Sequence, residues 1–534
     1  MQINHEKKKE INIEAIAPPR PAAWMVPVAT ERMLAWVVVL FAMVAGAFLR
    51  LWQVNAIGYN TDEAVYSGQA AAIAGVPGLK DFFPVFRAHP LLFQFVLSLI
   101  YKVHFDDLVG RLLAVVIGLA TVYLTYELGK VLYGRLPGAL AALFMAFMPY
   151  HVVVSRQVLL DGPMVFFSTL TLYMLARFGI SQRTRWIYAA GISMGLTFLS
   201  KETSLILLGA IYAFLALSPE LHVRVRDLII APILMALVIA PFPLSLIVAG
   251  GTSTGQQYLV WQLFRRPNHT ATFYLETVPV ALGILVIAAA VLGLILLWRQ
   301  HSWREKLLLS WILVPVIFFQ LWPVKGFQYL LSIAPPLAIL AARLLGYSWN
   351  AIRNRQDSVQ MGRVGMPPLV SWIATGVIVL SLAIASWQRI QPQPSSQFLA
   401  GTGGVPGGRE TGAWIQANVP AYAQFMTIGP SMANIIQFYG ARKAYGLGTS
   451  PNPLHRNPAY EPINNPDDQI RSSEIQYIVW DSFSAARTPF FADKLMGYVN
   501  KYFGRAVHTE SIAFQDANGN LVSKPIIIIY EVRP

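Results

Sequence analysis

The 534-residue sequence contains no cysteine, which excludes disulfide bonds, thiolate metal sites and cysteine nucleophiles. Charged residues are also scarce, at 13% of the chain, whereas ordinary soluble domains carry about 25%. Hydrophobic residues make up 55% of the sequence, and the mean hydropathy is +0.49. This composition predicts an integral membrane protein with many spanning helices.

Basic residues outnumber acidic ones, 41 to 27, and give a formal net charge of +14. They are scattered between apolar runs and form no basic face with interleaved aromatic residues, so we expect membrane lipids as partners and no nucleic acid. The N-terminal segment holds Lys7, Lys8 and Lys9 and then polar, proline-rich sequence, which fits a cleaved signal peptide poorly. We therefore expect residues 1–32 to be a cytoplasmic tail and the first apolar run to remain as an anchor.

The sequence contains about eleven apolar windows able to cross the roughly 30 Å of hydrocarbon in a bilayer, although a few of them are short. They lie near residues 33–52, 108–127, 136–154, 162–178, 186–200, 203–217, 227–248, 276–298, 307–322, 326–345 and 368–388. The predicted fold class is therefore an α-helical multi-pass membrane protein, with its transmembrane domain at residues 33–388.

One further apolar segment, from Pro90 to Phe105, decides the topology. Its apolar stretch from Leu91 to Tyr101 is short for a span and fits an interfacial helix better. If it does not cross, the cytoplasmic loops carry more than twice as many Lys and Arg residues as the outer loops before the last helix, as the positive-inside rule expects. We therefore expect a cell-membrane protein with a cytoplasmic N-terminus and a first outer loop at residues 53–107.

The composition changes after the last span. Residues 389–409 are rich in Pro, Ser and Gly, which indicates a linker. From Glu410 onward predicted helices such as "PSMANIIQFYG" alternate with predicted strands such as "IQYIVWD" and "KPIIIIYEV". We expect residues 410–534 to form a small C-terminal extracytoplasmic α/β domain. Such a domain either contributes loops to a site or braces the membrane domain, and we expect the second role.

This topology gathers ionisable residues on the outer face, several of them at helix ends or in very short loops. Ionisable groups at such depth usually line a cavity. Asp62 and Glu63, an adjacent acidic pair just past the first apolar run, are the leading candidates, although such a pair also serves simply to cap a helix. Lys201 and Glu202, in a turn between two short apolar helices, are either cavity residues or an internal ion pair.

Other outer-face residues have equally simple structural explanations. Asp161, followed by Gly and Pro, fits a helix N-cap. His89, just before Pro90, fits the start of an interfacial helix. Arg265 and Arg266 suit contacts with phospholipid headgroups as well as contacts with a substrate.

Taken together, six sequence blocks resemble a known family. The blocks are "YNTDEAVYSGQA", "FRAHPLLF", "GRLLAVVIG", "SRQVLLDGPMVFF", "GLTFLSKETSLILL" and "VKGFQYLLSIAPPLAIL". Their order and spacing resemble the polyprenyl-phosphate-dependent glycosyltransferases of the GT-C class, which include protein O-mannosyltransferases and lipid A aminoarabinose transferases. The resemblance covers roughly residues 30–345. It implies eleven or more spans, interfacial helices in the first outer loop, and an active site facing away from the cytoplasm.

The resemblance also implies roles for individual residues. Asp62 matches the acid proposed as catalytic base, and Glu63 its partner. The residues that we expect to bind substrate, partly from these matches and partly from their charge on the outer face, are His89, Arg111, Asp161, Lys201, Lys325, Tyr329, Arg265 and Arg266. Two blocks depart from the family pattern, since "HPLL" replaces His-Pro-Pro-Leu and "SKE" replaces Thr-Lys-Gly. The second departure places Glu202 beside the expected phosphate site.

The chemistry explains why such residues are needed. A sugar linked to a lipid phosphate leaves that phosphate without needing a proton, so one base acting on the acceptor hydroxyl suffices for displacement with inversion, whereas a glycoside hydrolase needs two carboxylates. The sequence therefore predicts transfer from a polyprenyl-monophosphate sugar to an extracytoplasmic protein, lipid or glycan, with no required cofactor. No zinc-ligand spacing is present, and a metal is not predicted, although carboxylates could hold a magnesium ion. The competing hypotheses are a lipid transporter or flippase and a non-catalytic subunit that keeps the fold.

Overall fold

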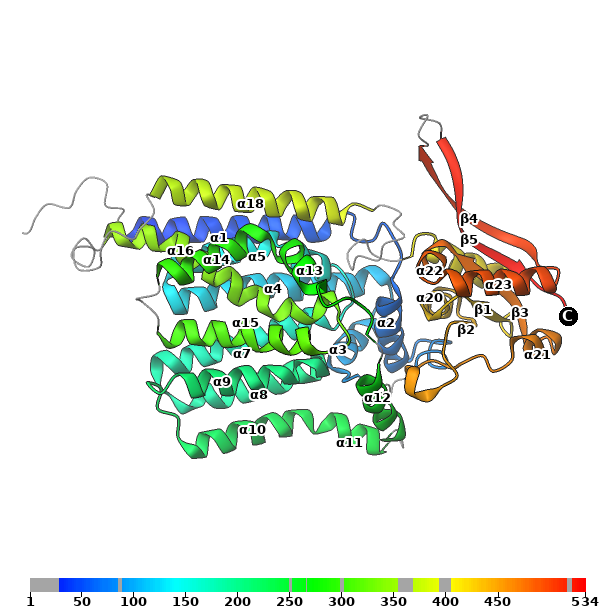
Figure 1. Cartoon of the computed structure of the whole chain (residues 1–534), viewed down its shortest axis with the longest axis horizontal. Coiled ribbons are helices and arrows are strands. Elements are labelled where there is room, and N and C mark those ends of the chain that lie inside the picture. Colours follow the sequence, from blue (N-terminus) through cyan, green and yellow to red (C-terminus); the bar gives the residue numbers. More distant parts are fainter. Residues whose placement is uncertain are drawn as a thin grey trace, which may run out of the picture.

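The computed structural model describes residues 28–84, 89–248, 252–265, 267–297, 302–353, 368–392, 405–515 and 521–534. A bundle of long helices occupies one end of the molecule, and a mixed helix and sheet region occupies the other (Figure 1). Most of the predicted tail (residues 1–27) and of the predicted linker (residues 393–404) lie outside the described residues.

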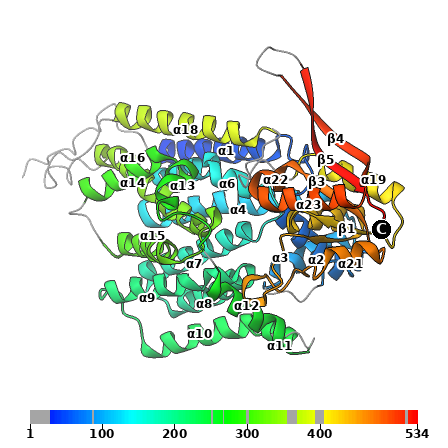
Figure 2. The ribbon, with the colours of Figure 1, turned by 45° about the vertical axis from the view of Figure 1, so that its right-hand side comes forward.

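The helical part contains the elements α1 (Val28–Leu51), α2 (Thr61–Ala74), α3 (Leu92–Tyr101), α4 (Asp107–Tyr133), α5 (Arg135–Phe147), α6 (Pro149–Val154), α7 (Asp161–Ser181), α8 (Thr184–Ser200), η1 (Glu202–Ile206), α9 (Leu207–Leu217), α10 (Val225–Ile239), α11 (Pro241–Val248), α12 (Thr252–Phe264), α13 (Phe273–Leu282), α14 (Ile284–Leu296), α15 (Trp303–Leu321), η3 (Phe327–Ile333), α16 (Ala334–Arg353) and α18 (Pro368–Ile390). Every apolar window of the sequence corresponds to one of these helices or to a consecutive pair. The long helices run side by side along the long axis of the molecule (Figures 1 and 2).

Six of the described helices are long and apolar enough to cross a membrane, or seven if the bent pair α13 and α14 counts as one span. The prediction of a multi-pass helical membrane protein is therefore confirmed, with six or seven such spans among the described residues. The predicted windows outnumber these helices because apolarity does not guarantee one continuous helix. The α13–α14 pair, for example, bends by 95° at Gly283, whose φ of 89° is readily available only to glycine.

Helix α5 shows why some windows are interrupted inside the bundle. Its 13 residues span about 20 Å at 1.5 Å per residue, and it stops at Pro149, which starts α6 instead of continuing α5. All residues from Leu136 to Phe147 are buried, because α5 packs against α1, α4 and α16. A helix that is apolar on every side is typical of such an interior position.

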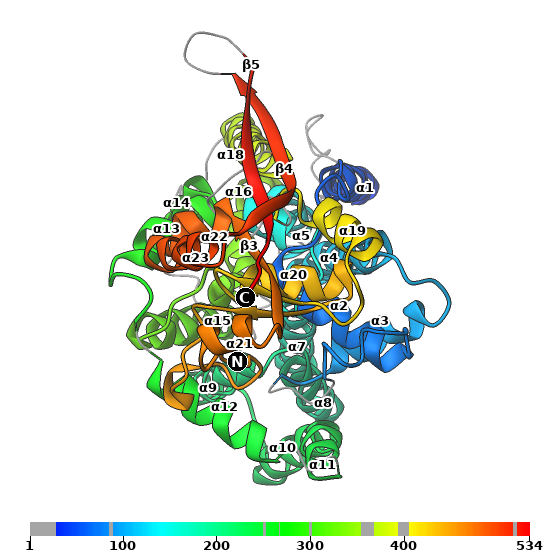
Figure 3. The same cartoon turned by 90° about the vertical axis from the view of Figure 1, so that its right-hand side faces the viewer.

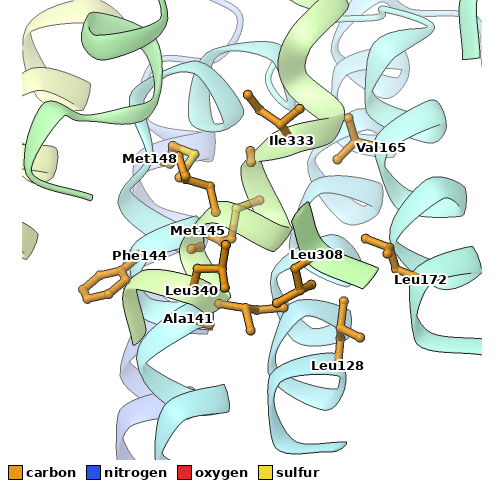
Figure 4. Packing of buried hydrophobic residues seen from close by; sticks show 14 of the residues in the cluster. Leu128, Ala141, Phe144, Met145, Met148, Val165, Leu172, Leu308, Ile333 and Leu340 are labelled. Atoms are coloured by element: carbon orange, nitrogen blue, oxygen red, sulfur yellow. The ribbon is translucent and has the colours of Figure 1, made fainter. Parts of the chain in front are cut away.

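Small residues allow α4 and α5 to pack closely. A Cβ on Gly129 would lie 2.7 Å from the Cα of Gly138, and a Cβ on Gly138 would lie 2.6 Å from the backbone oxygen of Tyr126. Close approach at small residues is a common way to associate helices in membranes. Side chains from α4, α5, α7, α15, η3 and α16 fill one core (Figure 4). The labelled members are Leu128, Ala141, Phe144, Met145, Met148, Val165, Leu172, Leu308, Ile333 and Leu340.

The C-terminal region forms a five-stranded mixed sheet in the order β2-β1-β3-β5-β4. Its elements are α19 (Gly408–Asn418), β1 (Gln424–Thr427), α20 (Pro430–Gly440), β2 (Lys443–Gly446), η4 (Pro453–His455), α21 (Pro466–Arg471), β3 (Ile475–Asp481), α22 (Ser482–Arg487), α23 (Pro489–Lys501), β4 (Arg505–Gln515) and β5 (Leu521–Glu531). Strands β1, β2 and β3 are parallel, with Phe425 opposite both Ala444 and Tyr477, whereas β5 is antiparallel to β3 and β4. The mixed helix and strand character predicted for this region is confirmed, although strands β2 and β4 were not predicted.

Helices α2 and α3 lie at the end of the bundle, next to the sheet region (Figures 1 and 3). Helix α3 is only ten residues long, about 15 Å, and so cannot cross a bilayer alone. Helix α2 packs against α3 on one side and against α20 of the sheet region on the other. The first acidic pair of the sequence therefore lies where the two parts of the molecule meet.

Candidate active site

The start of α2 is fixed by a capping box. The Asn60 side chain accepts a hydrogen bond from the Glu63 backbone N–H, and the Glu63 carboxylate accepts one from the Asn60 N–H at 3.1 Å. This reciprocal pairing satisfies two backbone donors that a helix start otherwise leaves unpaired. Asp62 therefore lies in the first turn of a helix whose starting residue is well defined.

Glu63 faces the protein interior and not a cavity. Its side chain is fully buried, and its two carboxylate oxygens accept hydrogen bonds from Arg111 Nε at 2.9 Å and Nη2 at 2.8 Å. The Val158 N–H donates to the same carboxylate. Arg111 also donates to the backbone oxygens of Val54, Ile57 and Gly58. Glu63 and Arg111, expected in catalysis and substrate binding, thus form a buried two-point ion pair that holds the loop before α2.

Asp62 faces the other way, into a cavity of about 580 Å³. The residues lining this cavity are Asp62, Tyr66, Tyr150, Leu159, Asp161, Lys201, Arg265, Asn268, His269, Val324, Lys325, Gly326, Phe327, Gln328, Tyr329, Ala486 and Arg487. Burial raises the pKa of the Asp62 carboxyl, and the nearby acids Asp161 and Glu63 raise it further, against the opposing effects of Lys201 and His89. Within the described parts of the chain, no hydrogen-bond donor contacts this carboxylate.

Asp161 and Lys201 form an ion pair in the cavity wall. The Lys201 ammonium lies 2.8 Å from Asp161 Oδ1, and both side chains are less than a tenth exposed. The same ammonium lies 5.5 Å from the centre of the Tyr329 ring, a cation–π contact. The Lys201 ammonium therefore contacts two other predicted site residues, Asp161 at the start of α7 and Tyr329 in η3.

His89 lies beside this wall, in contact with Glu202. Its Nδ1 is 3.1 Å from a Glu202 carboxylate oxygen, and the Tyr258 hydroxyl donates to the other Glu202 oxygen at 3.0 Å. The His89 ring packs edge-on against Tyr66, which does line the cavity. The alternative of an internal Lys201–Glu202 pair is not what the structure has, since each of these residues has a different partner.

Lys325 lines the same cavity, and hydrogen bonds to its backbone hold it in place. The Asn268 side chain accepts from the Lys325 N–H and donates to its carbonyl oxygen, both at 2.8 Å. The Lys325 ammonium donates to the carbonyl oxygens of Gln320 and Trp322 at the end of α15. No carboxylate of the described residues pairs with it. Arg265 lines the same cavity and covers the Trp261 ring.

The sheet region contributes to the cavity through α22, with Ala486 and Arg487 in the lining. Burial lowers the pKa of His269, and the charges of Arg487 and Lys325 lower it further. Sequence reasoning did not select Tyr66, Tyr150, Asn268 or Arg487. No sequence signal identified Arg487, because its place depends on how the sheet region docks on the bundle.

Six of the predicted site residues therefore line one cavity: Asp62, Asp161, Lys201, Arg265, Lys325 and Tyr329. His89 is adjacent, Glu63 and Arg111 lie apart as a buried pair, and Arg266 is outside the described residues. The described residues contain no group of three or more His, Asp or Glu side chains able to hold a metal ion. The lining has more basic than acidic groups, and one acid is already paired, so the cavity suits an anionic ligand such as a phosphate.

The family model of dolichyl-phosphate-mannose-protein mannosyltransferases matches residues 88–247. This match, over less than a third of the chain, confirms the resemblance of part of the sequence to polyprenyl-phosphate glycosyltransferases, and the multi-pass bundle with its C-terminal sheet region has a fold similar to that of ArnT.

Two particular proteins show the likeness in detail. The structure of ArnT from Cupriavidus metallidurans in the apo state has a TM-score of 0.65 at 13% identity, and the match covers 93% of this chain and 98% of that chain. The same protein bound to undecaprenyl phosphate has a TM-score of 0.63, also at 13% identity, with 94% and 98% covered. The oligosaccharyltransferase of Archaeoglobus fulgidus, tethered with an acceptor peptide, follows with a TM-score of 0.60 at 12% identity, covering 92% of this chain and 74% of that one.

A relative by sequence is the undecaprenyl phosphate-alpha-4-amino-4-deoxy-L-arabinose arabinosyl transferase of Serratia proteamaculans (strain 568), which is 30% identical over 167 residues. This match covers 29% of the chain and 30% of the relative, so it spans less than a third of the curated protein. The structural likeness establishes the fold alone.

Proposed function

We propose that this protein is an inverting glycosyltransferase that moves a sugar from a polyprenyl monophosphate to an acceptor hydroxyl. One observation carries the proposal: the half-buried Asp62 carboxylate shares a cavity of about 580 Å³ with Lys325 and Arg265. A base for the acceptor and cations for a phosphate are the two requirements of this chemistry. The ArnT structure bound to undecaprenyl phosphate supports a polyprenyl carrier for the donor.

In the proposed reaction, Asp62 takes the proton of the acceptor hydroxyl as its oxygen bonds to the anomeric carbon. The bond from that carbon to the phosphate oxygen breaks, and its electron pair leaves with the polyprenyl phosphate. General-base assistance of this kind contributes about 10² to 10⁴ in rate. Attack from the face opposite the leaving phosphate inverts the anomeric configuration.

The leaving phosphate gains one negative charge during transfer, so cations that contact it stabilise the transition state more than the ground state. We assign this role to Lys325 and Arg265, with Lys201 contributing while Asp161 holds it in place. Tyr329 positions the Lys201 ammonium, and His89 fixes Glu202 at the edge of the site. Glu63 and Arg111 act indirectly, because they hold the loop that precedes Asp62.

We further propose that all eleven apolar segments cross the membrane, with residues 33–388 as the transmembrane domain and the N-terminus in the cytoplasm. The cavity and the domain at residues 410–534, joined by the linker at 389–409, then face outward. Loop charges support this orientation. The ten-residue length of α3 supports an interfacial position for this helix. The acceptor is then an extracytoplasmic protein, lipid or glycan.

The experiment is transfer of a labelled sugar from a polyprenyl phosphate by the purified full-length protein in lipid nanodiscs. We expect Asp62→Asn to reduce kcat by at least about 100-fold. Asp106→Asn is the matched control, since Asp106 only caps α4 by accepting from the Leu108 N–H, and Asn caps a helix equally well.

Transfer that survives Asp62→Asn would overturn the mechanism. Binding of the lipid phosphate without any transfer by the unaltered protein would favour a non-catalytic subunit, and movement of the intact lipid between leaflets would favour a flippase.

A further inference from the structure

Three side chains of the C-terminal region bind the short segment that leads into Asp62. Arg409 lies on α19, whereas Asn434 and Tyr439 lie on α20. Figure 3 shows α20 beside α2, and the two helices are packed together. None of the three side chains lines the cavity. Their partners are backbone and side-chain groups of residues 55–61 and Asp107.

Arg409 binds the beginning of this segment. Its guanidinium donates to the backbone oxygen of Asn55 at 3.1 Å and to the Asn55 side-chain oxygen at 2.7 Å. It also forms an ion pair with Asp107 at 2.6 Å, in which the Asp107 side chain is 10% exposed. One cation of the C-terminal region therefore joins the segment to the first turn of α4.

Tyr439 and Asn434 bind the end of the segment, on either side of the residue that caps α2. The Tyr439 hydroxyl accepts from the Tyr59 N–H at 2.8 Å and donates to Asp107 at 2.9 Å. The Asn434 side chain donates to the Thr61 hydroxyl at 2.9 Å. Thr61 is the residue directly before Asp62.

The segment approaches the C-terminal region closely at Gly58. A Cβ at this position would lie 2.9 Å from the Cβ of Arg409 and 3.3 Å from its backbone nitrogen. Any larger residue would therefore push α19 away. On its other side, the same segment is bound by Arg111 of α4 through the backbone oxygens of residues 54, 57 and 58.

We infer that the C-terminal domain sets the position of Asp62, with Tyr439 as the central positioning residue. This inference rests on the proposed function of Asp62 as the base. Arg111 and Glu63 hold the loop from the side of the bundle, and Arg409, Asn434 and Tyr439 hold it from the other side. A displacement of about 1 Å at a reacting group can lower the rate as much as 100-fold. The sheet region is thus part of the catalytic apparatus without contributing a base.

The test compares Tyr439→Phe with Tyr502→Phe in the full-length protein. Tyr439→Phe removes both hydrogen bonds of the hydroxyl and keeps the ring that packs against Phe438 and Tyr59. Tyr502→Phe makes the same chemical change at a hydroxyl bonded to Asp467, inside the C-terminal region. We expect Tyr439→Phe to lower kcat by roughly 10- to 100-fold, with less than a twofold change in KM for the donor, and Tyr502→Phe to leave kcat unchanged.

A second measurement does not depend on activity. Hydrogen exchange of a peptide covering residues 55–65 reports how firmly the segment is held. We expect faster exchange there in Tyr439→Phe and in Gly58→Ala, and no change in Tyr502→Phe. Faster exchange in Tyr439→Phe, together with no sugar transfer by the unaltered protein, would mean that the C-terminal region does hold residues 55–61. The proposed glycosyltransferase function would then be wrong. Unchanged exchange together with unchanged kcat in Tyr439→Phe would overturn the inference.

Discussion

At the scale of single residues, the adjacent acids Asp62 and Glu63 have opposite environments. Glu63 is fully buried and meets the two nitrogens of Arg111, so its charge is compensated inside the protein. Asp62 keeps a carboxylate directed into the cavity, where burial raises its pKa. Neighbours in sequence point in different directions on a helix, and here one acid holds the structure while the other is available for chemistry.

The raised pKa of Asp62 predicts that both the activity and the stability of the protein depend on pH. We expect kcat/KM to fall as the pH drops through a value above the ordinary pKa of an aspartate, because the base must be ionised. A carboxyl whose folded pKa is raised favours folding at acid pH, and this contribution is lost as the pH rises. Asp62→Asn should therefore raise the melting temperature at neutral pH and have little effect below pH ~4, the ordinary range of Asp. Thermal unfolding over a pH series checks this, and a lower melting temperature at neutral pH would contradict it.

The pairing of Glu63 with Arg111 could not be predicted from the sequence. The two residues are 48 positions apart, and both were equally good candidates for a ligand site by their charge. Only the tertiary structure, which brings the start of α2 to the start of α4, shows that each satisfies the other. Asp161 and Lys201 differ, because they pair with each other and still line the cavity.

At the scale of elements, α22 is a short helix with a defined start. The Asp481 carboxylate accepts from the Ser484 N–H at 2.7 Å, and the helix then presents Ala486 and Arg487 to the cavity. Asp481 is fully buried, and burial raises its pKa to about 6. The cap and the charge therefore act in opposite directions on stability above pH 6.

Two variants of Asp481 separate these effects. Asp481→Asn keeps the cap without the charge, so we expect a higher melting temperature than the unaltered protein above pH 6 and little difference at pH ~4. Asp481→Ala loses both, and should be less stable than Asp481→Asn by about 1 kcal/mol at any pH. Unfolding measurements on the two variants check this prediction, and equal stabilities would show that the hydrogen bond to Ser484 adds nothing.

The sequence located elements with continuous apolar character better than the others. The predicted helix "PSMANIIQFYG" and strand "IQYIVWD" coincide with α20 and β3. Strand β2 was missed because only Ala444 and Tyr445 of its four residues are apolar, and β4 because polar residues interrupt its apolar ones. The break at Pro149 was missed because apolar residues continue on both sides of it.

At the scale of the whole molecule, the sequence predicted one cavity gathered from distant segments, and the six lining residues that it named come from five stretches of the chain. The docking of the C-terminal region could not be predicted, because its contacts involve ordinary polar residues such as Asn434 and Tyr439. Nothing in the sequence around these residues indicates a role, because their contacts with the segment before Asp62 exist only in the tertiary structure.

The orientation in the membrane can be tested with single cysteines, since the chain has none of its own. We expect a membrane-impermeant maleimide added outside intact cells to label cysteines at positions 102 and 422, and not one at position 183. All three native side chains are exposed, so their reactivity depends on the side of the membrane and not on burial. Labelling at position 183 alone would mean that the protein is inserted the other way round.

The interface around Gly58 has a consequence for recombination between related proteins. A chimaera that exchanges only the C-terminal region, cut at the linker, would join an α19–α20 surface to a foreign segment 55–61 and lose the matched partners of Arg409 and Tyr439. Relatives should therefore inherit this segment and these two helices together. Successful grafts are expected to transfer both, even though more than 340 residues separate them along the chain.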